Sequence, residues 1–275
     1  MLKDIVVYVT GGQEDGSRIG HAAALATGYD VSLTAVHLNK MPELIAPTDY
    51  LGAGYLQTVM SESQERSRQA HEELRRRLSG LTVPHDLRQI EGYPGRIGDA
   101  LAAEVRTSDL FVGTLPYADR DRSGHIEEAV LFKSGRGCLF VPTDAPVRES
   151  YDTIFLAWKN TREAARAAAE ALPFLQRAAL VIIGVVEESG ASEQYGETVG
   201  TDIARYLSRH EVTTELRAIN GWSDAGEALL NEAEKTSAQM IVMGGYGHSR
   251  FREWVLGGVT RHVMTHARVP VLTAH

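Results

Sequence analysis

The stretch RRLSGLTVPHDLRQIEG at residues 76–92 occurs a second time, as RYLSRHEVTTELRAING at residues 205–221. Eight of the seventeen aligned positions are identical, whereas unrelated sequences of ordinary composition would share about one. The same register continues through the segments that follow, with shifts of only a residue or two. A linker with two prolines, PTDAPVRES at 142–150, separates the copies. The sequence therefore predicts two tandem domains, 1–149 and 150–275, that arose by duplication.

Each copy is predicted to alternate strands and helices. The strand candidates are runs of Val, Ile and Leu without polar alternation, which is typical of a parallel sheet covered on both faces. In the second copy we expect strands near 153–158, 179–186, 212–219, 240–245 and 270–274, with helices near 161–175, 200–209, 225–237 and 258–266. In the first copy we expect strands near 4–9, 31–37, 86–91, 109–113 and 138–142, with a long charged helix near 57–79. This predicts an α/β fold of two tandem, doubly wound, five-stranded parallel sheets with helices on both faces.

The composition narrows the classes of function. With 275 residues and 43% hydrophobic side chains, the chain is long enough for two globular domains. Its formal net charge of −8 opposes attraction to phosphate backbones, so nucleic-acid binding is disfavoured. Cys138 is the only cysteine, which excludes an internal disulfide and a CxxC site. We expect a cytoplasmic protein without membrane attachment, because no apolar run is long enough for a signal-peptide core or a membrane span.

One segment, MGGYGHSRFREWVLGGVTRHVM at 243–264, has the features of a ligand site because it follows an apolar strand. In an open α/β sheet, ligands bind beyond the carboxyl ends of the strands. Glycines there let backbone N–H groups approach an anion, and the N-terminus of the next helix favours a phosphate. The predicted backbone cradle consists of Gly244, Gly247 and Gly257. Gly258 opens the next helix within the site, and His248, Ser249 and Arg250 are added donors. A simple strand-to-helix turn would also explain the glycines, since the spacing matches neither Walker A nor the Rossmann pattern.

The spacing of glycine, two residues, glycine, nine residues, glycine and a small residue, followed by VTRHVM and a closing PVL strand, resembles the universal stress protein family. The resemblance covers both copies and implies a tandem member of that family. It implies that the loop holds the phosphates of ATP or AMP, with Mg²⁺ accompanying ATP. We assign adenine packing to Val185, and we include Val259 beside the last glycine in the site.

Two positions depart from the family pattern. Lys159 stands where the resemblance implies an aspartate that contacts the nucleoside, and Gly258 stands where it implies a serine or threonine. Loss of a hydrogen bond to a charged group weakens binding by roughly 1.5–3 kcal/mol. Lys159 is able to reach a phosphate or another anion instead, and we include it in the predicted site.

The first copy lacks the glycine loop. Its counterpart, GTLPYADRDRSGHIEEAVLFKSGRG at 113–137, has Leu115 and Pro116 in the turn, and proline removes a backbone donor that an anion cradle needs. Its first strand ends at Thr10 rather than at an aspartate, and alignment of VLFKSGRG with VLGGVTRH puts Phe132 in place of a motif glycine. We predict that this copy binds no nucleotide and has a structural role, with another ligand around 134–136 as the alternative.

The leading hypothesis is a stress-response regulatory protein whose second copy binds an adenine nucleotide or a related phosphate ligand. The alternative is an interaction protein with vestigial pockets, whose hydrophobic last strands, CLFVP and PVLTA, pair the two domains. A weak ATPase is the least supported hypothesis, because no convincing general base or GxSxG elbow accompanies the loop and no catalytic residue is assigned. No metal site is predicted, since His262 and His266 share a helix face without a third ligand. A homodimer is left open.

Overall fold

The computed structural model describes residues 2–43, 53–117, 124–186, 193–246 and 258–275. The N-terminal half contains β1 (Asp4–Val9), α1 (Asp15–Tyr29), β2 (Ser32–Lys40), α2 (Ala53–Leu78), β3 (His85–Gly92), α3 (Pro94–Val105), β4 (Leu110–Thr114), α4 (His125–Lys133) and β5 (Gly137–Val141). The C-terminal half contains β6 (Thr153–Ala157), α5 (Arg162–Leu175), β7 (Leu180–Val186), α6 (Glu193–Ser208), β8 (Thr214–Ile219), α7 (Ala225–Lys235), β9 (Met240–Gly244), α8 (Gly258–His266) and β10 (Val271–Ala274).

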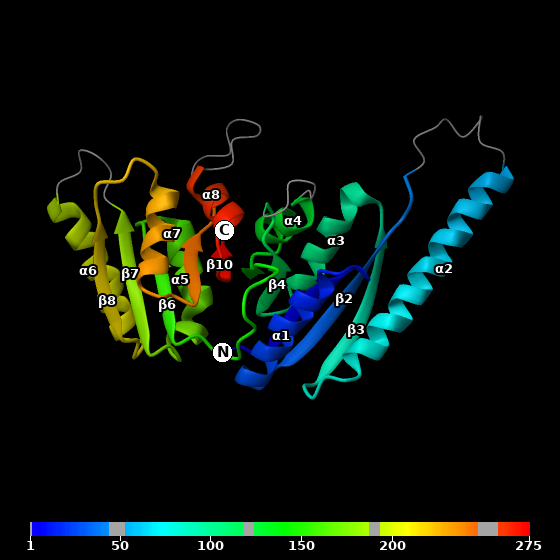
Figure 1. The fold of residues 1–275 in the computed structure, drawn as a ribbon, viewed down its shortest axis with the longest axis horizontal. Coiled ribbons are helices and arrows are strands. Elements are labelled where there is room, and N and C mark those ends of the chain that lie inside the picture. Colours follow the sequence, from blue (N-terminus) through cyan, green and yellow to red (C-terminus); the bar gives the residue numbers. More distant parts are fainter. Residues whose placement is uncertain (1, 44–52, 118–123, 187–192, 247–257) are drawn as a thin grey trace.

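The strands form one continuous ten-stranded sheet in the order β3-β2-β1-β4-β5-β10-β9-β6-β7-β8 (Figure 1). Within each half all neighbouring strands are parallel, and the order 3-2-1-4-5 returns as 8-7-6-9-10. This confirms the predicted doubly wound units. The halves meet at β5 and β10, which pair antiparallel with Leu272 opposite Leu139. The two predicted sheets are therefore merged into one, through the strands CLFVP and PVLTA.

Helices cover both faces of this sheet, and each face has one apolar core that runs through both halves. On one face α1, α2, α5 and α6 contribute core residues, with Leu25 from the N-terminal half and Phe174 from the C-terminal half. On the other face α3, α4, α7 and α8 contribute, with Leu101 and Val263 as examples. Strands buried on both sides explain why their sequences lack polar alternation.

The observed elements follow the local sequence closely, with one clear difference. Thr161 caps α5 by accepting a hydrogen bond from the backbone N–H of Ala164 at 3.3 Å, as expected for threonine before a helix. α6 begins at Glu193 rather than near residue 200, and it therefore includes Gly196. Glycine disfavours a helix but does not prevent one. Within the described ranges, no helix combines the length and apolar character that crossing a membrane requires.

Candidate functional site

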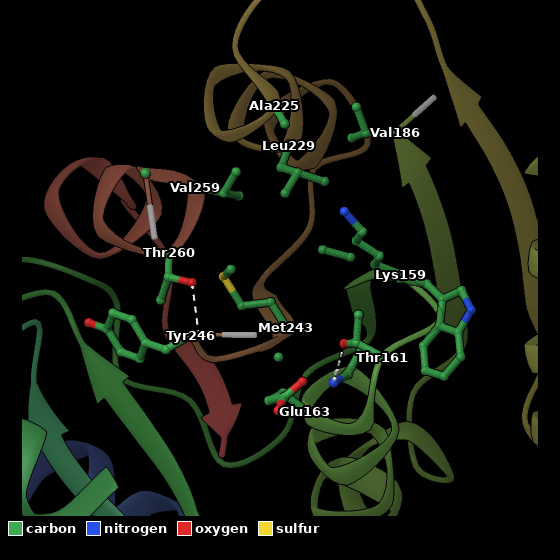
Figure 2. A pocket seen from close by; sticks show the side chains of 15 residues that line it. Lys159, Thr161, Glu163, Val186, Ala225, Leu229, Met243, Tyr246, Val259 and Thr260 are labelled. Carbon is green, nitrogen blue, oxygen red and sulfur yellow. Dashed lines mark hydrogen bonds between the residues drawn. The ribbon is translucent and has the colours of Figure 1, made fainter. Parts of the chain in front are cut away.

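The C-terminal half has a cavity at the carboxyl ends of β6 and β9 (Figure 2). These strands are neighbours in the sheet, but the chain leaves β6 toward β7 on one side and turns from β9 toward β10 on the other. A crevice at such a reversal of strand order is where open α/β sheets bind ligands. The cavity has a volume of about 300 Å³, which suits a small molecule.

Apolar side chains form much of the cavity wall. Val186 ends β7, Leu229 lies on α7, Met243 on β9 and Val259 in the first turn of α8, and Figure 2 shows them around a common space. Ala157, the last residue of β6, adds only a methyl group. Walls of this kind suit a flat, weakly polar ring, with orientation left to a few polar groups.

Gly244 ends β9 where α5 comes close to the sheet. A Cβ atom at this position would lie 2.5 Å from the backbone nitrogen of Ala164, so a larger residue would force the start of α5 to shift. The close contact brings Thr161 and Glu163, at the start of α5, to the edge of the cavity. The glycine at 244 is therefore required for the packing of α5 against the end of β9.

Two charged side chains, one just after β6 and one at the start of α5, reach the cavity. Lys159 follows β6, and its side chain points toward Val186 and Leu229 (Figure 2). Glu163 is 7% exposed and lies 3.1 Å from the guanidinium of Arg162. Burial by itself would raise the pKa of the Glu163 carboxyl. The hydrogen bond from its own backbone N–H and the charge of Arg162 have the opposite effect and outweigh burial, so the pKa is lowered and the carboxyl is ionised at neutral pH. The cavity thus offers a cation and an anion beside apolar surface.

The turn after β9 is tied to α8 by a backbone contact. Tyr246 has a φ of 56°, in the left-handed region that non-glycine residues seldom adopt. Its backbone N–H donates to Oγ1 of Thr260 at 3.3 Å, and both residues line the cavity (Figure 2). This bond fixes the distance between the end of β9 and the first turn of α8.

Of the residues predicted for the site, some line this cavity: Lys159, Gly244, Gly258 and Val259. Others lie outside the described residues: Gly247, His248, Ser249, Arg250 and Gly257. The expectation for Val185 needs correction. Because successive strand residues point to opposite faces, Val185 packs in the core beneath α5 and α6, and Val186 faces the cavity instead.

Several lining residues escape sequence reasoning. Leu229 and Met243 resemble core residues in the sequence, because a cavity wall and a core occupy the same apolar positions of a helix or strand. Tyr246 and Thr260 lie within the glycine segment, but no spacing rule indicates that the hydroxyl of one meets the backbone of the other. Glu163 is missed for a different reason. An acidic residue in the first turn of a helix is favoured by the helix dipole alone, so its position does not indicate a ligand site.

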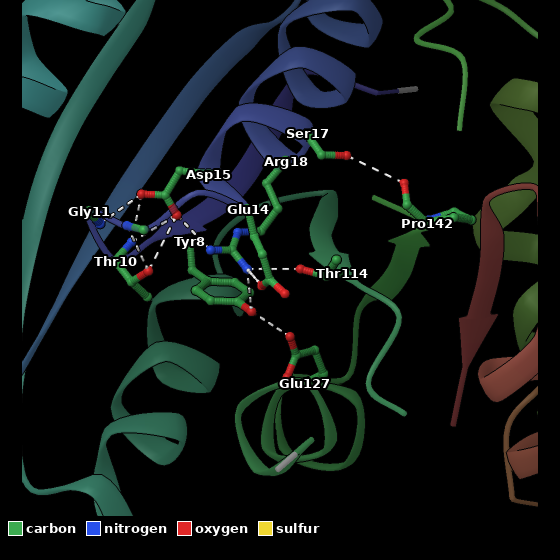
Figure 3. A network of polar contacts seen from close by, with 11 residues as sticks. Tyr8, Thr10, Gly11, Glu14, Asp15, Ser17, Arg18, Thr114, Glu127 and Pro142 are labelled. Carbon is green, nitrogen blue, oxygen red and sulfur yellow. Dashed lines mark hydrogen bonds and ion pairs between the residues drawn. The ribbon is translucent and has the colours of Figure 1, made fainter. Parts of the chain in front are cut away.

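The corresponding place in the N-terminal half, at the ends of β1 and β4, holds a buried polar network (Figure 3). Strand registers place Tyr8 where β6 has Ala157. Thr114 ends β4 as Gly244 ends β9. Two small residues at the border of the C-terminal cavity are thus replaced by larger hydrogen-bonding ones.

Arg18 of α1 is the centre of this network and is 2% exposed. Its Nη2 lies 2.5 Å from Oδ1 of Asp15, and its Nη1 donates to Tyr8 Oη and Thr114 Oγ1, each at 2.8 Å. Asp15 is fully buried and also accepts hydrogen bonds from two backbone N–H groups in the turn before α1. A buried guanidinium requires such acceptors, because an unpaired charge away from water is very costly.

The structure also corrects the alignment of the last helices. α4 and α8 each have nine residues and precede the last strand of their half. A Cβ atom on Gly98 would meet Ala129 of α4, and one on Gly226 would meet His262 of α8, each at 2.8 Å. α4 therefore corresponds to α8, and VLFKSGRG does not correspond to VLGGVTRH. Phe132 lies in the last turn of α4 and replaces no motif glycine.

With this register, Glu127 in the first turn of α4 corresponds to Thr260 in α8. Glu127 is 1% exposed and accepts a hydrogen bond from the hydroxyl of Tyr8 (Figure 3). The N-terminal half thus has a buried carboxylate at the helix end where a phosphate would otherwise be favoured.

The structure also shows the surroundings of the histidine pair on the last helix and of the single cysteine. The rings of His262 and His266 are 4.5 Å apart on α8, but among the residues that the structure describes no group of three or more potential metal ligands occurs. Cys138 is completely buried on β5, and burial raises the pKa of its thiol, which disfavours the reactive thiolate form.

Known proteins resemble both the sequence and the fold. Residues 150–275 match the sequence model of the universal stress protein family. A universal stress protein of Synechocystis sp. is 39% identical over 49 residues, a stretch that spans 18% of this chain and only 17% of that protein. The structure of a universal stress protein from Archaeoglobus fulgidus DSM 4304 has a TM-score of 0.75 at 15% identity, with 98% of this chain and 95% of that chain covered.

A second solved structure, described under the same family name, comes from Pseudomonas aeruginosa UCBPP-PA14. It has a TM-score of 0.60 at 15% identity, with 98% of this chain and 92% of that chain covered. At this identity the two structures show a common fold, and both extend over the two halves together. By sequence, residues 150–275 match the universal stress protein family, and by fold the whole chain is similar to the two solved structures of proteins with that family name.

Proposed function

We propose that the C-terminal half binds an adenine nucleotide, ATP or AMP, or a related phosphate ligand, and that the protein is a cytoplasmic regulator in the stress response. The observation that carries the proposal is the contrast between the two matched sites. The site is open in the C-terminal half, whereas Tyr8, Arg18 and Glu127 occupy it in the N-terminal half. The family motif supports the choice of ligand, because the resemblance implies a phosphate-binding loop there.

In this proposal the base packs against Val186, Leu229 and Met243, and the phosphates extend toward the start of α8 at Gly258. The N-terminus of α8 favours the negative charge, and Lys159 adds a cation at the cavity. Mg²⁺ that accompanies ATP would be held at least in part by the ligand's own phosphates. The N-terminal half takes no nucleotide in this scheme.

Filling the cavity tests the proposal. Ala157→Tyr introduces the ring that the N-terminal half carries at Tyr8, and we expect calorimetric titration with ATP or AMP to show at least a tenfold loss of affinity, because the ring takes the ligand's space. Ala169→Tyr, an identical change at an exposed position of α5, is the control and should bind like the natural protein. Equal nucleotide binding by Ala157→Tyr, or no heat with the natural protein at millimolar nucleotide, would contradict the proposal.

The alternative, an interaction protein with vestigial pockets, is separated from nucleotide binding by the same titration. Pairing of β5 with β10 agrees with both functions, so it does not decide between them. Incubation with Mg-ATP followed by product analysis separates binding from slow hydrolysis, and we expect no ADP above the protein-free blank.

A further inference from the structure

An aromatic cluster joins the C-terminal cavity to the N-terminal half. Tyr246, which lines the cavity, packs on Phe132 of α4 with ring centroids 4.9 Å apart. Its hydroxyl lies 3.0 Å from the hydroxyl of Tyr117, which follows β4. Two residues of the N-terminal half therefore contact a wall residue of the neighbouring site.

The hydroxyl contact has a defined direction. Tyr117 donates its single proton to the carboxylate of Glu128, so Tyr246 must donate to Tyr117. Burial raises the pKa of Tyr246 to about 12, which keeps this donor protonated at neutral pH. Arg261 of α8 lies over the ring of Tyr117 at 5.4 Å from its centroid. Groups from both halves thus hold the pair of tyrosines.

A second set of contacts holds the backbone before Tyr246. The ring of His275 packs edge-on against Phe132 with centroids 4.9 Å apart. Nδ1 of His275 lies 3.1 Å from the carbonyl oxygen of Gly245. The backbone N–H of Gly245 in turn donates to the carbonyl oxygen of Ala274 at 3.0 Å. Phe132 therefore supports the turn at residues 245–246 both directly and through His275.

This support matters because Tyr246 has a left-handed backbone conformation. For a residue with a bulky side chain that conformation is unfavourable and persists only where surrounding contacts enforce it. Its N–H bond to Thr260 depends on the same conformation. Loss of the support from α4 would release the strain and alter the wall between β9 and α8.

We infer that Tyr117 and Phe132 are positioning residues for the ligand site of the C-terminal half, although they belong to the N-terminal half. They act through Tyr246 and its bond to Thr260. The inference rests on the proposed function for its ligand, which is the same nucleotide. The N-terminal half, whose own site is occupied, thereby serves the site of its neighbour.

The test removes the ring of Phe132. We expect Phe132→Ala to weaken ATP or AMP binding about 3–10-fold in calorimetric titration, a range typical of residues that couple to a site without touching its ligand. In the ligand-free protein, the NMR methyl signals of Met243 and Val259, which line the cavity, should shift as well. Phe132→Tyr keeps the ring and should restore both measurements.

Val130→Ala is the matched control, because Val130 lies on the same helix and is completely buried in the core. It should lower the melting temperature without changing nucleotide affinity or the two methyl signals. The inference is overturned if Phe132→Ala leaves both measurements unchanged, or if Val130→Ala changes them equally. Should the natural protein bind no nucleotide, the proposed function fails, and the ligand-free methyl signals alone decide the positioning role.

Discussion

Tyr8 and Ala157 occupy equivalent positions near the carboxyl ends of the central strands of their halves, and they differ by a phenol group. The phenol hydroxyl of Tyr8 accepts a hydrogen bond from Arg18 and donates one to Glu127. A guanidinium so deeply buried must also be neutralised, and Asp15 does this from the same helix. A few residues thus determine whether this place in the fold is open to a ligand.

At this scale we predict that Asp15→Ala lowers the free energy of unfolding by about 3 kcal/mol, because the buried Arg18 loses its buried counter-charge and keeps only the partly exposed Glu14. Urea denaturation followed by circular dichroism measures the change. Adding Arg18→Met to the same chain should recover part of the loss. Glu65→Ala, which removes an exposed partner of Arg68, should leave the midpoint unchanged. A midpoint for Asp15→Ala equal to that of the natural protein would contradict the assigned role of the pair.

Among the elements, the helix pairs α3–α4 and α7–α8 are built alike. GDAL at 98–101 corresponds to GEAL at 226–229, and in both pairs the glycine faces the second helix at close range. In the C-terminal half this contact sets the position of α8, which carries Val259 and Thr260 of the cavity.

We therefore predict that Gly226→Ala destabilises the protein by about 1–3 kcal/mol through overpacking, although alanine favours helix over glycine by about 1 kcal/mol. It should weaken nucleotide binding too, since α8 must move away from α7. Denaturation and calorimetric titration measure the two effects. Gly54→Ala, in α2 where an added Cβ meets nothing within 4 Å, is the control. An increase in stability of Gly226→Ala would contradict the prediction, because it would show that α7 and α8 can move apart at no cost in free energy.

The sequence predicts elements better than it predicts contacts between them. The bounds of β1 and α8 agree with the structure, because an apolar run and a glycine-led helix start are local signals. The predicted alignment of VLFKSGRG with VLGGVTRH is wrong. The two segments share only a Val-Leu pair, which is too short to fix an alignment when the connections before α4 and α8 differ in length. Lys159, Gly244, Gly258 and Val259 could be placed at the cavity from strand ends and spacing. Val185 could not, because a one-residue error moves a strand side chain to the other face.

In the whole molecule, the two halves share their cores. Both apolar clusters contain residues of both halves. Tyr29 of α1 packs on Phe174 of α5 with centroids 5.1 Å apart, and Arg177 lies over the ring of Tyr29 at 4.3 Å. Together with the β5–β10 ladder, these contacts favour one cooperative folding unit.

The three tryptophans, Trp158, Trp222 and Trp254, all lie in the C-terminal half, so their fluorescence reports on that half alone. We predict that Asp15→Ala, in the N-terminal half, lowers the fluorescence midpoint of urea unfolding as much as the circular dichroism midpoint. This follows if the halves unfold together. A fluorescence midpoint that stays at the natural value, with only the circular dichroism curve displaced, would show independent unfolding.

The antiparallel ladder between Leu139 and Leu272 has a consequence for how the two sites can change. Because both strands belong to one polypeptide, the local concentration of each for the other is fixed by the chain, and dilution does not separate them. In a symmetric pair of identical chains, a mutation at one site would appear at both. Here Tyr8 and Ala157 are separate codons, so one half can give up a ligand and become a support while the other remains open.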